Sequence, residues 1–175
     1  WSSDVCSSDL VIDQRNAGAS TTPTSNVTYT LDRWCMTLSQ SSKYSVQQQT
    51  SVVPTGFNYA MKFTSLSAYT VGAGEVFGFR QMIEGFNFAD MGWGTANAKT
   101  VTLSFQVYSS LTGTFGGVIA NSAQNRNYPF TYTISSANTW TSISVTIPGD
   151  TTGTWLTTNG VGMYVIFGLG AGSSY

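Results

Sequence analysis

Thr100-Val101-Thr102-Leu103-Ser104-Phe105-Gln106-Val107-Tyr108 is the stretch that decides the fold class of this chain. Apolar and polar residues alternate along it, and alternate side chains of an extended strand point to opposite faces of a sheet. The apolar residues therefore share one face, while the other face carries Thr102, Ser104, Gln106 and Tyr108. The stretch predicts a β-strand whose apolar face packs in a core and whose polar face points outward.

The same period of two recurs along the rest of the chain. It is present in Tyr59/Met61/Phe63, Tyr128/Phe130/Tyr132/Ile134, Ile143/Val145/Ile147 and Val161/Met163/Val165/Phe167/Leu169. Turn signals lie between these stretches at Val53-Pro54-Thr55-Gly56, Thr112-Gly113 with Gly116-Gly117, Ile147-Pro148-Gly149-Asp150 and Asn159-Gly160. This spacing predicts an all-β, antiparallel two-sheet β-sandwich and leaves no room for a parallel α/β fold. Four aromatic residues have core parity and are expected to be buried: Phe63, Phe105, Phe130 and Phe167.

One segment, residues 86–94, indicates helix. Asn87 is suited to cap a helical turn, and Gly92 and Gly94 are suited to end it. We therefore predict a structured crossover loop with a single helical turn.

The first ten residues, Trp1–Leu10, read as the in-frame translation of a common short-read sequencing adapter, TGG AGT TCA GAC GTG TGC TCT TCC GAT CT. Residues that never evolved with the fold are excluded from structural argument. The expected domains are therefore residues 1–10, an assembly artefact without specific packing on the fold, and residues 11–175, a single β-sandwich module. We expect this module to be truncated at both ends, as in a metagenomic fragment.

The charge balance excludes several classes of partner. The chain has 7 basic and 8 acidic residues and no His, and removing the first ten residues takes away Asp4, Asp9 and Cys6. The remaining charge is close to neutral, which offers no basic field for nucleic acid or an anionic membrane. No run of about 18 apolar residues is available to span a bilayer. Cys35 is expected to be a small buried hydrophobic residue, since no His is present to activate it.

The acidic residues do not indicate catalysis. Glycoside hydrolysis requires two carboxylates about 5–10 Å apart, and nothing in the spacing of the six remaining acidic residues brings two together: Asp13, Asp32, Glu75, Glu84, Asp90 and Asp150. A zinc site is excluded without His and with one Cys. A Ca²⁺ ion held by backbone carbonyls with Asp13 or Asp150 would leave no recognisable pattern, and the sequence leaves this open. No catalytic residue and no cofactor is predicted.

Aromatic residues are the abundant functional side chains of this chain. Sugars stack their C–H faces on aromatic rings, while their hydroxyls bond to polar side chains. The aromatic residues outside core parity or in loops are Trp93, Tyr108, Trp155 and Tyr164. We predict a ligand-binding surface formed by Trp93, Gln106, Tyr108 and Tyr164, which converge if strands 101–107 and 161–169 share a sheet.

Four motifs carry a resemblance to a known family. They are Tyr29–Trp34 (YTLDRW), Gln81–Gly85 (QMIEG), Lys99–Phe105 (KTVTLSF) and Asn138–Trp140 leading into Ser144–Asp150 (SVTIPGD). In order and spacing the chain resembles the jelly-roll modules of bacteriophage tail-fibre and other virion proteins, which are similar to carbohydrate-binding modules of the galactose-binding-like type. The likeness covers Val11 to the end. It implies a two-sheet jelly roll whose sugar-binding relatives use a concave sheet face or the loops at one end, with a further strand after this fragment.

The function expected from these observations is weak glycan or host-surface binding by a non-catalytic module of a phage tail fibre or appendage. The resemblance implies an extracellular virion location, with other virion subunits as partners in a homotrimer. The alternative is a purely structural spacer or decoration domain without ligand. The third interpretation is that the chain is a fragment of a polysaccharide-degrading tail enzyme.

Overall fold

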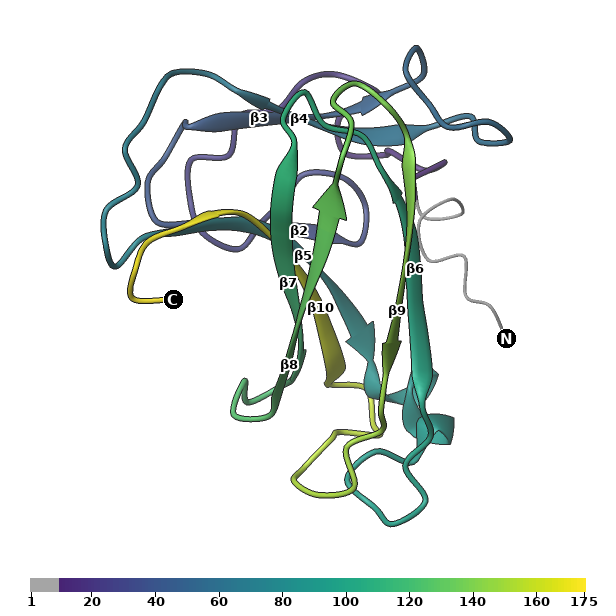
Figure 1. The fold of residues 1–175 in the computed structure, drawn as a ribbon. Helices are drawn as coiled ribbons and strands as arrows, with labels where there is room; N and C mark the ends of the chain where they lie inside the picture. Colours follow the sequence, from purple (N-terminus) through teal and green to yellow (C-terminus); the bar gives the residue numbers. More distant parts are fainter. Residues whose placement is uncertain (1–9) are drawn as a thin grey trace. The chain divides into compact units, whose positions relative to one another are not determined.

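The structure is a computed structural model that describes residues 10–175 (Figure 1). Its regular elements are strands and two short 3-10 helices, which confirms the all-β prediction. The second part of the chain contains, in order, β5 (Val76–Glu84), η1 (Gly85–Asn87), η2 (Ala89–Met91), β6 (Val101–Val107), β7 (Gly113–Asn121), β8 (Asn127–Ile134), β9 (Thr141–Ile147) and β10 (Val161–Ala171). They are preceded by β1 (Thr28–Tyr29), β2 (Trp34–Leu38), β3 (Tyr44–Gln49) and β4 (Ala60–Ser65). Within residues 10–175, no helix has the length and apolar character needed to cross a membrane.

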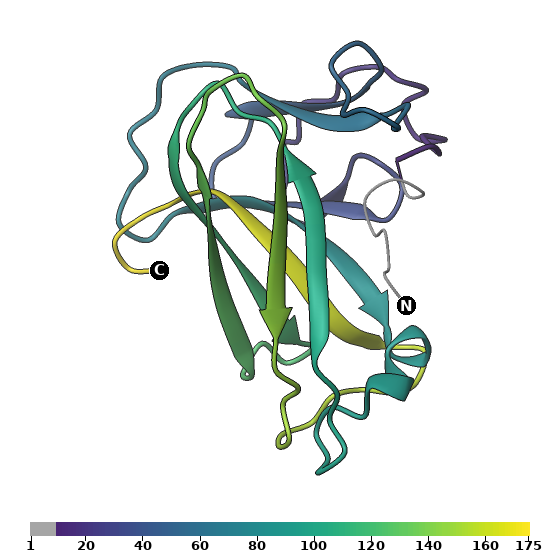
Figure 2. The ribbon, with the colours of Figure 1, turned by 45° about the vertical axis from the view of Figure 1, so that its right-hand side comes forward.

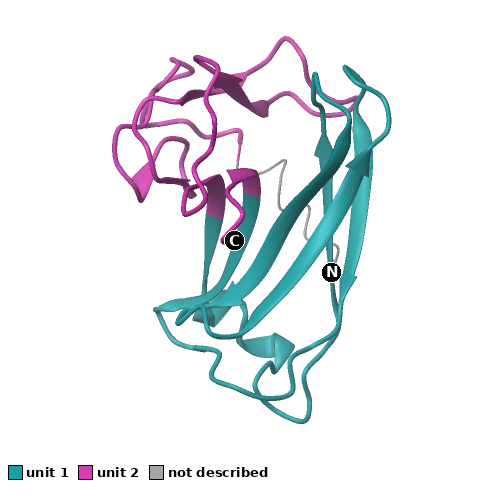
Figure 3. Ribbon diagram, turned by 60° about the vertical axis from the view of Figure 1, so that its left-hand side comes forward, with its two compact units in different colours: residues 1–3, 81–167 teal, residues 4–80, 168–175 magenta. Residues whose placement is uncertain are grey.

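The described chain divides into two compact units (Figure 3). Unit 1 comprises residues 81–167, and unit 2 comprises residues 10–80 together with 168–175. Strands β5 and β10 contribute residues to both units.

Unit 1 is a sandwich of two antiparallel sheets. In one sheet the strand order is β5-β10-β7-β8, and in the other β6 pairs with β9. Figure 2 shows β6 and β9 side by side along their length. The ring of Phe105 on β6 lies 5.1 Å from that of Tyr132 on β8 and 5.0 Å from that of Phe167 on β10, centroid to centroid. These edge-to-face contacts between the two sheets form the core of the unit.

The predicted strand phases are confirmed in unit 1. Leu103 and Phe105 are buried on β6, whereas Thr102 and Gln106 are exposed. Strands β8 and β10 bury the residues that the alternation assigned to the core, among them Phe130 and Phe167.

The turn predicted at Gly116-Gly117 is wrong, because both glycines lie inside β7. Gly117 pairs with Phe130 on β8. A Cβ added at Gly117 would lie 2.4 Å from the Phe130 ring and 2.6 Å from the backbone oxygen of Ile166. The glycine therefore serves close packing within a strand rather than a change of chain direction.

Unit 2 contains the antiparallel pairs β1/β2 and β3/β4. Cys35 on β2 is fully buried and free, which confirms its role as a small core residue. Burial raises the pKa of its thiol. Phe63 on β4 is half-buried rather than buried, and its ring stacks on Phe79 at 4.4 Å. Its strand lies in a two-stranded sheet, where the face predicted to be core is only partly covered.

Nine of the ten residues read as translated adapter lie outside the described residues. The tenth, Leu10, is buried, and its carbonyl oxygen accepts a hydrogen bond from the Gln48 side-chain amide. At Leu10 the structure therefore differs from the expectation of no specific packing.

The segment after β5 forms the compact crossover that the sequence predicted. It contains two successive 3-10 helices, η1 and η2, instead of one turn. Asn87 is the last residue of η1 and caps neither helix, because the N-cap positions belong to Glu84 and Phe88. Gly92 ends η2 in the left-handed conformation with φ of 64°, which glycine adopts without steric cost.

Candidate functional site

An open pocket of about 510 Å³ lies at one end of unit 1. Four segments form it: the segment after η2, the connection between β7 and β8, the start of β8, and the connection between β9 and β10. The lining residues are Trp93, Asn125, Arg126, Asn127, Tyr128, Pro148, Gly149, Asp150 and Trp155. Aromatic and polar side chains in one concavity are typical of a binding site.

Asn121 holds the β7–β8 connection in place. Its buried side-chain amide donates to Asn125 Oδ1 at 2.8 Å and to the Thr154 carbonyl at 2.9 Å. Its carbonyl Oδ1 accepts from the backbone N–H groups of Asn125 and Arg126 at 3.1 and 3.2 Å. Both amide donors and the acceptor of one side chain thus fix the β7–β8 connection and join it to the β9–β10 connection.

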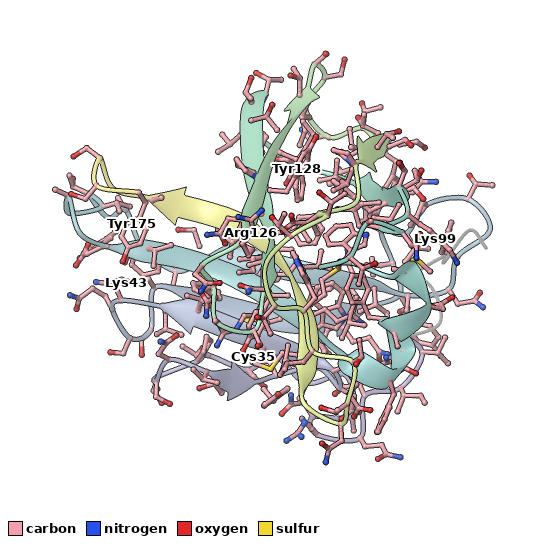
Figure 4. The ribbon with its side chains drawn as sticks, turned by 90° about the horizontal axis from the view of Figure 1, so that it is seen from below. Cys35, Lys43, Lys99, Arg126, Tyr128 and Tyr175 are labelled. Carbon is pink, nitrogen blue, oxygen red and sulfur yellow. The ribbon has the colours of Figure 1, made fainter. Side chains whose placement is uncertain are left out.

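Arg126 and Asp150 form a two-point ion pair across the same two connections. Arg126 Nε donates to Asp150 Oδ2 at 2.8 Å, and Nη2 donates to Oδ1 at 2.7 Å. Nη2 also donates to Thr152 Oγ1 at 2.8 Å. Parallel hydrogen bonds between a guanidinium and a carboxylate fix orientation as well as distance. Figure 4 shows Arg126 close to Tyr128, an aromatic residue that also lines the pocket.

Two aromatic residues of the lining, Trp93 and Trp155, form a cluster of three rings with Phe88. Trp93 and Trp155 meet edge to face at 4.6 Å, and Phe88 lies 5.2 Å and 5.7 Å from them. The Trp93 indole N–H donates to the Lys99 carbonyl at 2.8 Å, and the Trp155 indole N–H donates to Asp150 Oδ2 at 3.1 Å. All three side chains are buried, so they support the polar rim and present little ring area to a ligand.

Tyr128 is the aromatic side chain of the lining that remains half-exposed. It lies on β8 opposite Ile119 of β7, on the face of the strand that carries Phe130 and Ile134 into the core. Directly opposed residues of an antiparallel pair share one face of a sheet. Tyr128 thus ends the inward-facing row, where the core opens into the pocket.

The ionisation state of the pocket's carboxylate follows from its partners. Its lining contains one carboxylate, Asp150, and no Ser, Thr, Cys or Lys side chain. Arg126 holds the pKa of that carboxyl well below its usual value by donating hydrogen bonds to it, with smaller contributions from the Thr152 backbone N–H and the Trp155 indole. Asp150 is therefore ionised and hydrogen-bonded, and a proton-donating role does not suit it.

This lowered pKa leads to a pH prediction. A carboxyl whose pKa is lower in the folded state stabilises the fold above its unfolded pKa, about 3.9, and loses that contribution as pH falls toward the folded value. We expect the difference in unfolding free energy between wild type and Asp150→Asn to stay constant from pH 7 to about pH 4 and to shrink below that. Urea unfolding at each pH measures it. A difference that had already vanished at pH 5 would contradict the described ion pair.

The four residues predicted to bind ligand are not brought together. Trp93 lines the pocket, but it is buried. Tyr108 follows the far end of β6, more than about 20 Å along the strand from the pocket, and its ring lies 5.4 Å from that of Trp140. Gln106 is exposed on β6, and Tyr164 is half-buried on β10 in the other sheet. The predicted convergence is wrong, because β6 pairs with β9 and β10 pairs with β7.

The two carboxylates named as calcium candidates bond to protein groups. Asp13 accepts from the backbone N–H groups of Asn16 and Gly18 at 3.1 and 2.7 Å, while Asp150 pairs with Arg126. Among residues 10–175, no cluster of three or more His, Cys, Asp or Glu side chains is placed to hold a metal ion.

Comparison with known proteins gives a distant structural similarity. No protein-family model matches this chain, and no curated protein matches it in sequence. Among solved structures, it is similar to the enzymatically active domain of tailspike protein 4 from Bacteriophage CBA120, with a TM-score of 0.49 and 13% sequence identity. The match covers 78% of this chain and 17% of the tailspike chain. This chain therefore corresponds to a small part of that protein's length.

Proposed function

We propose that this chain is a non-catalytic glycan-binding module of a phage tail fibre or appendage, and that its pocket in unit 1 holds the sugar. The observation that carries the proposal is the half-exposed Tyr128 beside Arg126, Asn125 and Asn127 in one concavity. The assignment to a virion appendage rests on the resemblance of the four sequence motifs to virion jelly-roll modules.

The lining supplies both kinds of contact that a sugar requires. The Tyr128 ring offers an apolar surface for a C–H face, while the side chains of Asn125, Arg126 and Asn127 offer hydrogen-bond donors at the rim. Asn125 and Arg126 lie on the β7–β8 connection, which Asn121 and the Arg126–Asp150 pair fix before ligand arrives. Fixed polar groups lose little conformational entropy on binding.

The expected affinity of a single pocket is low. Stacking on one aromatic ring contributes on the order of 1–2 kcal/mol, which together with a few exposed hydrogen bonds gives a millimolar site. Several copies in one appendage would raise the effective affinity by linking the binding events. A homotrimeric arrangement in the virion suits such a module.

A non-catalytic role is favoured by the carboxylates of the pocket. Glycosidases place two carboxyl groups about 5–10 Å apart, and the lining holds Asp150 alone. That group is paired with Arg126.

Tyr128→Ala is expected to abolish glycan retention because it removes the stacking surface. The measurement is binding to a glycan array by the full chain, biotinylated and displayed on streptavidin, with circular dichroism as the check of folding. Tyr108→Ala is the matched control: it removes an exposed tyrosine at the far end of β6 and should leave retention unchanged.

The other outcomes separate the remaining readings. Loss of retention in Tyr108→Ala but not in Tyr128→Ala would move the site to the Tyr108–Trp140 pair and contradict the pocket. No retention of any glycan by the multivalent wild type would favour a structural spacer. Release of sugar from capsular polysaccharide would show a depolymerase.

A further inference from the structure

The charges of the pocket cancel within its lining. Arg126 and Asp150 are the charged residues of the lining, and the two groups lie 2.7 Å apart. Their side chains are 43% and 19% exposed, so both remain accessible to solvent. A charged group on a ligand would be attracted by one of these two residues and repelled by the other, with nearly equal energies.

Asp150 has no remaining capacity to bind a ligand hydroxyl. Its carboxylate accepts five hydrogen bonds, two from Arg126, two from Thr152 and one from the Trp155 indole. A carboxylate offers about four lone-pair positions. Asp150 thus acts on a ligand through its negative charge and through its hold on Arg126.

Arg126 is well placed to attract an anion once Asp150 is neutral. Its Nε and Nη2 carry the bonds to Asp150 and Thr152, whereas Nη1 takes no part in them. A guanidinium binds carboxylate and sulfate groups strongly through such N–H groups. The residue that keeps the pocket from behaving as an anion site is therefore Asp150.

We propose that Asp150 makes the pocket selective for uncharged glycans by neutralising Arg126, so that sugars bearing carboxylate or sulfate groups are not preferred. The inference rests on the proposed function, since it names the class of glycan that the same pocket takes. It assigns Asp150 as a specificity-determining residue.

A charge cycle tests the proposal. Wild type, Asp150→Asn, Arg126→Gln and the double variant are displayed on streptavidin, and each is applied to an array that pairs neutral hexose glycans with the same glycans carrying uronic acid. The readout is the ratio of acidic to neutral retention, at low and at high ionic strength. Using a ratio removes any general weakening of the pocket by the substitutions.

Wild type should retain the neutral member of each pair at least as well as the acidic one. Asp150→Asn should raise the ratio on the order of tenfold at low ionic strength, because Arg126 is then an unbalanced positive charge, and high ionic strength should suppress the gain. The double variant should return to the wild-type ratio. Arg126→Gln should lower the ratio, which keeps the test decisive if Asp150→Asn does not fold.

A wild-type preference for acidic glycans, or an unchanged ratio in folded Asp150→Asn, would overturn the inference. Both results leave the proposed function standing, because glycans are still retained and Tyr128→Ala still removes them. Loss of the proposed function has a different signature, since wild type then retains neither member of a pair.

Discussion

Phe105→Ala should destabilise the chain by about 3–5 kcal/mol, the usual cost of removing a buried phenyl ring. Phe105 is 9% exposed, and its ring contacts Tyr132 and Phe167 on two strands of the facing sheet. Truncation leaves a cavity between the two sheets of unit 1. The strands on either side fill this cavity only in part, because hydrogen bonds hold them in their sheets. The free energy of unfolding in urea, compared with wild type, measures the effect.

Phe86→Ala is the matched control for this prediction. Phe86 lies in η1 and is 65% exposed, so the same chemical change should alter stability by no more than about 0.5 kcal/mol. Destabilisation of Phe105→Ala below about 1 kcal/mol would show that β6 has the opposite phase.

Asn121→Ala should lower stability by about 2–3 kcal/mol and abolish glycan retention. The buried side chain makes four hydrogen bonds to Asn125, Arg126 and Thr154. Removing it leaves the backbone N–H groups of Asn125 and Arg126 and the Thr154 carbonyl without this partner. An unsatisfied polar group at a partly buried position lowers stability by more than the net contribution of its hydrogen bond. The pocket should loosen because Asn121 joins its two sides.

Two measurements separate the parts of this prediction. Urea unfolding gives the stability change, and array retention at a temperature well below the unfolding transition gives the binding change. Asn159→Ala, at an exposed position before β10, should change neither. Retention at the wild-type level in a folded Asn121→Ala chain would mean that the connections are held in place without this side chain.

The fold could be predicted from the sequence because strand alternation is a local signal. Leu103 and Phe105 are separated by one residue, and their shared face follows from the geometry of a single strand. The Gly116-Gly117 pair shows where this local signal fails. Glycine is typical of turns, yet Gly117 is in a strand because the Phe130 ring packs against it, and that contact depends on pairing between strands.

The pocket could not be predicted in the same way. Arg126 and Asp150 are 24 positions apart, and they meet because the β7–β8 and β9–β10 connections lie at the same end of unit 1. The sequence marks Trp93 as an aromatic residue in a complex loop, but its burial depends on Phe88 and Trp155. A density of Asn residues in the segment Asn121–Asn127 was the available signal for the missed residues, since short polar side chains commonly fix tight connections.

The division between strands and connections in unit 1 has a consequence for how such a module diversifies. The hydrophobic contacts that hold the sheets together come from strands, whereas most of the pocket lining comes from segments between them. Connections tolerate substitution and insertion better than the strands they join. Substitutions at a few loop positions can therefore change the side chains that line the pocket, while the scaffold that displays them is unchanged.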